Sequence, residues 1–431
     1  MGSAFAKATA DMRGTCDVRR SVGIWFWPLI AWLIVTLIAV FVSQDSWAAF
    51  GHWRAFMLEP VIVFIILNNV LRRTSQSSYV EENTTNKPHN DKGWIWRGLF
   101  LSIAIVTILL GVYAIFQYLT GWGIPSPWDV EAMRRATGIF GYPNGLSLFI
   151  VPFGVVSLIS FVQRTMYNVQ RFGWDSILFL IATVSAGIAT TLAKSMGGIL
   201  AFGAGVVLTL IIYKKTRVIG IVLTVLGVLG AGLVAWQIYG TELHPETIED
   251  GLASSKKWSS SVRVIIWKES FEIIKDNPIF GTGLRSFKTA ILPYHTATWM
   301  ETFPHPHNIF LMLWIETGIL GLLAFVWLIG TWVYIVLRPT SPPDRASGRR
   351  QSSHVNGAKD ERSATAKATA DMRATWDVRR IVWLIPLVVI LVHGMVDMPY
   401  FKNDLAIQFF LLAALATTLS HNPELVSGSN Q

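Results

Sequence analysis

Ten long apolar blocks, separated by short polar stretches, dominate the sequence. They lie at residues 23–43, 55–71, 98–120, 145–163, 174–192, 197–213, 218–239, 308–337, 381–396 and 402–420. A helix needs about 20 mostly apolar residues to cross a bilayer. Only 15% of the 431 residues are charged, whereas soluble domains contain about 25%. The sequence therefore predicts an all-α, polytopic membrane protein with about ten transmembrane helices and one large extracytoplasmic loop.

The basic residues predict an orientation for this bundle. With both chain ends in the cytoplasm, 24 of the 36 Lys and Arg residues fall on the cytoplasmic side. Because short cytoplasmic loops carry an excess of Lys and Arg, the pattern favours this orientation. The net charge is +9, but the basic residues adjoin apolar blocks and form no patch interleaved with aromatic residues. We therefore expect membrane lipids, and not nucleic acid, as partners.

The predicted topology divides the chain into seven segments. Residues 1–22 form a cytoplasmic tail, 23–239 the first seven helices, 240–307 the large extracytoplasmic loop, 308–337 the eighth helix, 338–380 a cytoplasmic and partly disordered loop, 381–420 the last two helices, and 421–431 a second cytoplasmic tail. The large loop is expected to contain an amphipathic helix from Val262 to Lys275, capped by serines 259–261 and ended by Asn277 and Pro278.

A near-perfect repeat occurs twice, each time directly before an apolar block. Ala6 to Arg20 and Ala366 to Arg380 are identical at 13 of 15 positions. A basic segment in this position can hold anionic lipid headgroups. It can equally be a repetitive genetic element translated in frame. Neither reading assigns chemistry to the repeat.

Two prolines and an asparagine surround a histidine at the end of the large loop. Pro304 and Pro306 prevent a helix before His307, and Asn308 can cap the helix that follows. His307 is therefore expected where the loop meets the membrane. A histidine in this position can act on a substrate, or it can simply satisfy the N-terminus of a helix.

The spacing that begins at His307 resembles a family signature. His307 and Asn308 are followed by Gly318 and Gly321, in an apolar helix expected to run without interruption, at the spacing found in the O-antigen ligase and O-antigen polymerase superfamily. Further similar pieces occur in the same order between about residues 98 and 420. They are RATGIFGYPN (135–144), Arg263 with Trp267, the segment from Asn277 to Phe287, and the turn Asp397 to Phe401. One position departs: Met196 stands where many members have arginine, and Lys194 lies nearby.

The resemblance implies an enzyme that transfers a glycan from a polyprenyl diphosphate carrier to an acceptor hydroxyl, with an active site that faces outward. It implies that His307 is catalytic, because imidazole can accept a proton near neutral pH. The expected diphosphate-binding residues are Arg263, Arg285, Lys194 and Arg135. The expected supporting residues are Asn308, Glu316, His305 and Asp397.

Each of these side chains also has a simpler explanation. Basic residues at helix ends extend readily into solvent, and a buried acid such as Glu316 can bond within the bundle instead of supporting His307. Asp397 can orient a substrate or face water. No cofactor is expected. Since His305 and His307 have no acidic cluster beside them in the sequence, metal-independent transfer is expected.

The acceptor is not readable from the sequence. It can be a glycan, a lipid or a protein, so a repeat-unit polymerase and a protein O-oligosaccharyltransferase remain alternatives with the same donor. A transporter of solutes such as inorganic carbon is the alternative from another class. A transporter is expected to show broken helices or internal repeats with ionisable groups near the middle of the membrane, whereas the unusual polar residues here concentrate near one surface.

Overall fold

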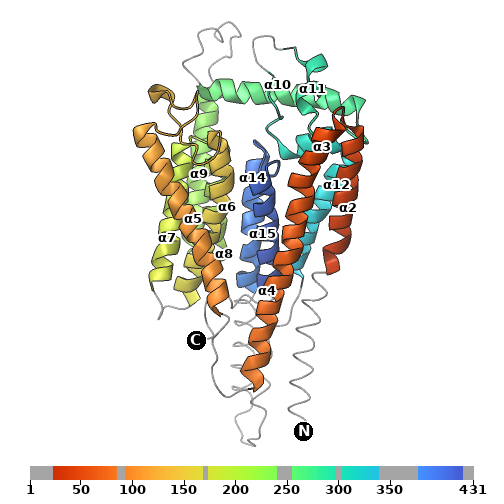
Figure 1. Cartoon of the computed structure of the whole chain (residues 1–431). Helices are drawn as coiled ribbons and strands as arrows, with labels where there is room; N and C mark the ends of the chain where they lie inside the picture. Colours follow the sequence, from red (N-terminus) through yellow and green to blue (C-terminus); the bar gives the residue numbers. More distant parts are fainter. Residues whose placement is uncertain are drawn as a thin grey trace, which may run out of the picture.

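The computed structural model describes residues 23–84, 93–167, 173–239, 255–296, 302–338 and 377–420. Within these residues the chain is helical and contains no strand, which confirms the all-α prediction. Figure 1 shows a bundle of steep helices with one helix, α10, lying across one end. The tails 1–22 and 421–431, most of the repeat, and the predicted disordered loop from residue 339 to 376 lie outside the described residues.

Each predicted apolar block contains a helix. These helices are α2 (Phe26–Val42), α4 (Glu59–Thr84), α5 (Gly93–Thr120), α6 (Pro143–Tyr167), α7 (Trp174–Leu192), α8 (Met196–Ile212), α9 (Arg217–Tyr239), α12 (Ile309–Leu337), α14 (Ile385–Gly394) and α15 (Asn403–Leu419). The connecting elements are α3 (Ser46–Trp53), the π-helical turn η1 (Arg54–Leu58), α10 (Ser255–Asp276), α11 (Phe287–Ala290) and the short turns η2 (Glu131–Met133), η6 (Leu292–Tyr294) and η8 (Val382–Leu384).

Five helical stretches in the described residues are long and apolar enough to cross a membrane. They are Ser46–Thr74, Trp94–Thr120, Pro143–Thr165, Trp174–Leu192 and Ile309–Leu337. The other apolar helices are shorter. The 17 residues of α2, for example, rise about 26 Å, slightly less than the hydrocarbon core of about 30 Å. The count of ten spans and the sidedness of the bundle therefore stay predictions.

Helix α6 is the centre of one half of the bundle. Its spanning stretch is 89% buried, against 33% to 50% for the other four. It packs against α5, α7 and α8 through small residues. A Cβ on Gly154 of α6 would lie 2.3 Å from the Cβ of Ala186 on α7, so only glycine permits this distance between the two backbones. Close approach through small residues is the usual way in which helices associate in a membrane.

The other half of the bundle is built around aromatic side chains. α2 packs against α12, and α15 packs against α4. Between these pairs Tyr400 is fully buried. Its ring centroid lies 5.6 to 5.7 Å from those of Trp32, Phe325 and Phe409. Tyr400 lies in the connection between α14 and α15, so this cluster fixes that connection against α2 and α12.

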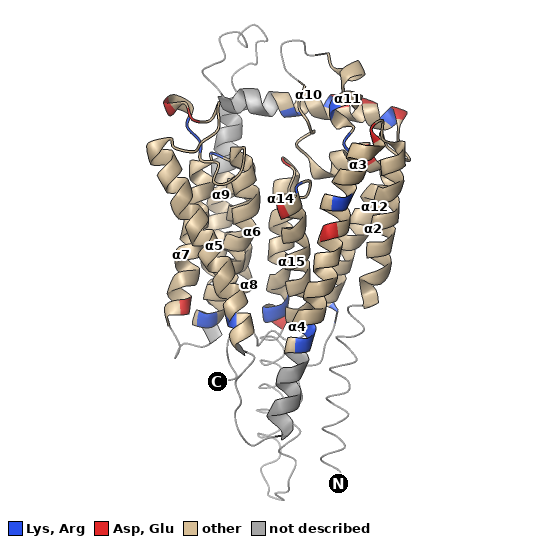
Figure 2. Cartoon of the chain, in the orientation of Figure 1, with Lys and Arg blue, Asp and Glu red and all other residues tan. Residues whose placement is uncertain are grey.

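Charged residues lie mainly at the two ends of the bundle, with uncharged residues between them (Figure 2). At the end opposite α10, the Asp175 carboxylate accepts two hydrogen bonds from Arg97, at 2.7 and 2.9 Å. Arg164 lies 3.3 Å from the same carboxylate. Because these three residues come from α7, α5 and α6, the ion pairs join three helices at one point.

Helix α12 is interrupted at Gly318, which corrects the prediction of a continuous helix. Gly318 has φ 67° and ψ −175°, a conformation that is nearly exclusive to glycine. The segment after α10 fills the interruption: Thr282 N donates to Ile315 O at 2.7 Å, and Ile319 N donates to Pro278 O at 3.0 Å. The backbone groups released by the break are therefore paired, as they must be inside a membrane protein.

Helix α10 begins earlier than predicted. It starts at Ser255, so serines 259–261 lie inside the helix and do not cap it. Its end at Asp276, just before Asn277 and Pro278, agrees with the prediction. Its buried residues Val262, Ile266, Ile273 and Ile274 pack with Leu311, Met312 and Ile315 of α12. This apolar contact holds α10 across the end of the bundle.

Candidate active site

The predicted cap at the start of α12 is confirmed. Asn308 Oδ1 accepts hydrogen bonds from Phe310 N at 2.9 Å and Leu311 N at 3.1 Å. Its Nδ2 donates to Met395 O at 3.1 Å, which ties the start of α12 to the loop after α14. The free backbone N–H groups at the start of α12 are thus capped by Asn308, and His307, directly before it, is not needed for this role.

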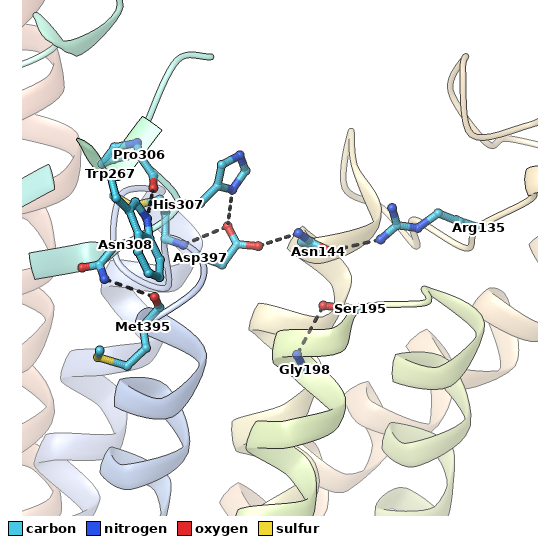
Figure 3. A network of polar contacts seen from close by, with 11 residues as sticks. Arg135, Asn144, Ser195, Gly198, Trp267, Pro306, His307, Asn308, Met395 and Asp397 are labelled. Atoms are coloured by element: carbon cyan, nitrogen blue, oxygen red, sulfur yellow. Dashed lines mark hydrogen bonds and ion pairs between the residues drawn. The ribbon is translucent and has the colours of Figure 1, made fainter. Parts of the chain in front are cut away.

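Helix α10 holds the loop that carries His307. The Trp267 indole N–H donates to Pro306 O at 2.9 Å, and Figure 3 shows this contact beside His307. The Phe303 ring meets the His307 ring edge-on, with centroids 5.6 Å apart. Trp267 and Phe303 were not among the predicted site residues, although Trp267 carries part of the resemblance.

Asp397 lies beside His307. The Asp397 Oδ1 atom is 3.7 Å from His307 Nδ1, which is longer than a hydrogen bond and makes this an electrostatic contact. Asp397 Oδ1 also accepts from Met398 N at 2.9 Å, and Oδ2 accepts from Asn144 Nδ2 at 2.6 Å. Asp397 is only 2% exposed. The predicted alternative in which Asp397 faces water is therefore wrong.

The charge state of Asp397 follows from its neighbours. Burial alone would raise the pKa of Asp397, but the adjacent imidazoles of His307, His393 and His305 lower it, and the net pKa lies below the usual range. The carboxylate is therefore ionised at neutral pH. An ionised carboxylate beside a histidine orients the ring and stabilises its protonated form.

Arg135 continues the network away from Asp397. Its Nε donates to Ala193 O at 2.8 Å, and its Nη2 donates to Asn144 Oδ1 at 3.2 Å and Lys194 O at 3.3 Å. The guanidinium lies 4.9 Å from the centre of the Trp128 ring. A polar chain thus runs from Arg135 through Asn144 to Asp397 (Figure 3). Asn144 was noticed only through the resemblance.

Lys194 lies in the turn between α7 and α8. The backbone there is ordered by Ser195, whose Oγ accepts from Gly198 N at 3.3 Å. Lys194 and Met196 are both exposed. The turn that lacks the expected arginine at Met196 therefore still presents one cationic side chain.

Three predicted site residues share an unusual backbone conformation. Among the residues that the structure describes, the non-glycine residues with positive φ are Lys194 (49°), Arg285 (63°) and His307 (51°). This region costs an L-residue about 1 kcal/mol or more. Such strained residues concentrate at functional sites, where the surrounding structure holds them in place. None of the three was chosen for its backbone, so the coincidence is independent support for them.

The two predicted arginines of the large loop occupy different surroundings. Arg263 is partly buried on α10. Burial lowers the pKa of Arg263, while the charge of Asp397 raises it, so Arg263 lies within electrostatic reach of the His307–Asp397 pair. Arg285 is exposed and lies within reach of His52 instead. The interactions of the described residues do not join Arg285 to His307.

Glu316 lies beneath the loop of Arg285. It is fully buried, close to the backbone N–H groups of Arg285, Ser286 and Phe287, although neither carboxylate oxygen makes a hydrogen bond of ordinary geometry. Of the two predicted roles, these contacts favour bonding within the bundle over support of His307.

His305 brings a third possible ligand atom to this place. Its ring centroid is 4.3 Å from that of His307, and burial lowers the pKa of His305 to about 4, so its ring is neutral at pH 7. One ligand atom each from His305, His307 and Asp397 lies within 4.8 Å of the others. The histidines have no acidic cluster beside them in the sequence, but the fold brings the single carboxylate of Asp397 to them. Two nitrogens and one oxygen match a three-ligand zinc site, whereas metal-independent transfer stays a prediction.

Comparison with known proteins shows which proteins this sequence is similar to. The sequence model of a family described as O-antigen ligase matches residues 181–326, a stretch that contains Lys194, Arg263, Arg285 and His307. An O-antigen ligase from Salmonella typhimurium is 22% identical over 316 residues, which cover 71% of this chain and 68% of the relative. A putative polysaccharide ligase from Rickettsia conorii is 21% identical over 265 residues, 55% of this chain and 64% of the relative. These matches support the O-antigen ligase superfamily as the group of proteins that this chain is similar to.

The similarity of this chain to its relatives is partial. An uncharacterized protein from Haemophilus influenzae is 22% identical over 253 residues, 56% of this chain and 60% of the relative. The chain thus spans less than two thirds of the length of this relative and of the Rickettsia protein. The matched family region ends before Asp397, so the His307–Asp397 contact is a finding of the structure and not of the match.

Proposed function

We propose that this protein is a glycan ligase of the cytoplasmic membrane. It transfers an oligosaccharide or polysaccharide from a polyprenyl diphosphate carrier to an acceptor hydroxyl at the outer face, without a metal ion. The observation that carries the proposal is the contact between His307 Nδ1 and the ionised Asp397 at 3.7 Å, at the end of the bundle that α10 covers (Figure 1).

In the proposed reaction His307 is the general base. The acceptor oxygen attacks the anomeric carbon of the glycan, the bond from that carbon to the diphosphate oxygen breaks, and the hydroxyl proton passes to His307 Nε2. Asp397 faces the other ring nitrogen and stabilises the imidazolium that forms, as in hydrolases with a histidine–carboxylate pair. An in-line attack of this kind inverts the anomeric carbon.

The leaving group is a lipid diphosphate that keeps the electron pair of the broken bond. Arg263 and Arg135 both lie within electrostatic reach of the catalytic pair, since burial lowers the pKa of each guanidinium while the charge of Asp397 raises it. Lys194 and Arg285 are exposed cations that we propose as further contacts of the diphosphate. Charge-assisted hydrogen bonds from guanidinium groups stabilise such an anion strongly in a partly buried site.

The broken helix α12 is a feature that transporters also show. Here the chain's own segment from Pro278 to Thr282 occupies the break through two backbone hydrogen bonds. A break that is filled in this way lines no solute path. This observation favours an enzyme over a transporter.

The proposal is tested with purified protein in lipid nanodiscs, a polyprenyl diphosphate-linked glycan and an acceptor. The variant His307→Ala is expected to lose at least 100-fold in transfer rate, because general base catalysis contributes about 10²- to 10⁴-fold. His295→Ala is the matched control, since His295 also contacts a carboxylate, that of Glu269 at 3.2 Å. Equal rates for the two variants would refute the role of His307.

The accumulated donor separates the ligase from its closest rival. In cells that lack a ligase, full-length glycan chains remain on the carrier, whereas single repeat units accumulate when a polymerase is lost. Transfer to a protein would instead be visible as loss of a glycosylated polypeptide. The measurement is the length distribution of the carrier-linked glycans.

A further inference from the structure

Two imidazole nitrogens near His307 have no hydrogen-bond partner. The Nδ1 atoms of His305 and His307 are both buried and make no hydrogen bond of ordinary geometry among the described residues, although the Asp397 carboxylate lies 3.7 Å from His307 Nδ1. Their rings meet edge-on, with planes 78° apart. Burying a polar atom without a hydrogen bond costs free energy. A ligand that binds both nitrogens would offset this cost.

The carboxylate of Asp397 completes the group on its third side. One ligand atom from each of the three residues lies within 4.8 Å of the others. In a tetrahedral zinc site with bonds of about 2.1 Å, ligand atoms lie about 3.4 Å apart. The present arrangement therefore needs to contract by about 1.4 Å or less, within the range of side-chain rotation.

The donor set selects among cations. Mg²⁺ and Ca²⁺ require several oxygen ligands, and this group offers the oxygens of one carboxylate. Zn²⁺ and Co²⁺ accept imidazole nitrogen readily. The nearby guanidinium groups of Arg135 and Arg263 repel any cation. This repulsion further weakens the binding of Mg²⁺ and Ca²⁺, for which the group offers few oxygen ligands. The chemistry therefore fits a borderline-soft divalent ion bound reversibly.

We propose that His305, His307 and Asp397 form a binding site for Zn²⁺ or a similar divalent ion, and that the bound ion inhibits glycan transfer. The inhibitory part rests on the proposed function, in which His307 is the base. A metal ion at the site withdraws Asp397 from His307 and occupies a lone pair of the imidazole. It also places a positive charge where the imidazolium must form, so the ion and the reaction exclude each other.

Binding is tested without any activity measurement. Co²⁺ is titrated into the purified full chain in nanodiscs, and the visible d–d absorption of a four- or five-coordinate site is recorded. One such site is expected per chain, displaced by Zn²⁺ and retained in His295→Ala. The absorption should disappear in His305→Ala and, separately, in Asp397→Asn, each checked for its melting temperature. Absorption that persists in both variants overturns the site.

Inhibition is tested by measuring the transfer rate of each variant with Zn²⁺ and without metal. The rate with Zn²⁺ is then divided by the metal-free rate of the same variant. The concentration of Zn²⁺ that halves the rate is expected to rise at least tenfold in His305→Ala, because even indirect changes to a metal site cost about 10- to 100-fold in affinity. EDTA should restore the wild-type rate. Equal sensitivity in both proteins, or stimulation by Zn²⁺, overturns the inhibitory role.

The proposed function and the metal site can be refuted independently of each other. If no form of the protein transfers glycan, the proposed function fails, together with the inhibitory role that rests on it. The Co²⁺ absorption of wild type and His305→Ala still decides whether the three residues bind metal.

Discussion

Replacing Asp397 by asparagine tests the catalytic pair most directly. The side chain keeps its shape and loses its negative charge, but its single amide oxygen can accept only one of the two hydrogen bonds that the carboxylate accepts from Asn144 Nδ2 and Met398 N. Asp397 is almost completely buried, and little water is available to replace that charge. The change therefore acts mainly on the protonated form of His307 that the reaction produces.

The size of the effect follows from the distance. Two unit charges 3.7 Å apart interact by about 1 kcal/mol in water and by about 4 kcal/mol at an effective dielectric constant of about 20. A change of about 1.4 kcal/mol in the barrier alters the rate tenfold. We therefore expect the Asp397→Asn variant to transfer glycan about 5- to 1000-fold more slowly.

The assay separates kcat from KM with carrier-linked glycan in nanodiscs. Because the imidazolium exists only in the transition state, kcat is expected to fall while KM stays close to the wild-type value. Asp404→Asn is the matched control, since Asp404 lies on α15 and no described contact joins it to His307. If Asp397→Asn keeps a kcat within twofold of this control, the pairing of Asp397 with His307 does not serve catalysis.

The same variant makes a prediction about stability. The pKa of Asp397 in the folded protein lies below its usual value, so its ionised form stabilises the fold above the unfolded pKa of about 4. That contribution disappears as the pH falls through the folded pKa. The difference in melting temperature between wild type and Asp397→Asn should therefore shrink as the pH is lowered below about 4.

Three further variants test the backbone around the site. Lys194→Gly should raise the melting temperature, because it removes about 1 kcal/mol of backbone strain, and should slow transfer; an unchanged rate would remove Lys194 from the diphosphate site. Asn308→Ala should lower the stability by about 1 kcal/mol through loss of the cap, whereas Asn308→Asp should lose less in the same thermal melt. Gly318→Ala should abolish folded protein in size-exclusion chromatography, since its Cβ would lie 1.9 Å from Ile279 O, while Gly330→Ala, with open space around it, should be tolerated.

Local features of the site were predictable because their causes are local. The cap at Asn308 depends on residues within three positions of it, and the end of α10 depends on the adjacent Asn277 and Pro278. The helices follow in the same way from blocks of apolar residues. His307 was placed correctly between loop and helix for this reason.

The contacts between distant segments were not predictable from one sequence. Asn144 and Asp397 are 253 residues apart, and no sequence pattern near either residue predicts their contact. The interruption at Gly318 likewise depends on the segment around Pro278, which supplies the missing hydrogen bond.

The order of the active-site residues along the chain has a consequence for synthesis. Asp397 comes after every other residue of the site, in the loop between the last two described helices. A ribosome therefore delivers Arg135, Lys194, Arg263 and His307 to the membrane well before their carboxylate partner. A chain released before α14 and α15 are inserted therefore holds His307 without the carboxylate that contacts it in the complete bundle.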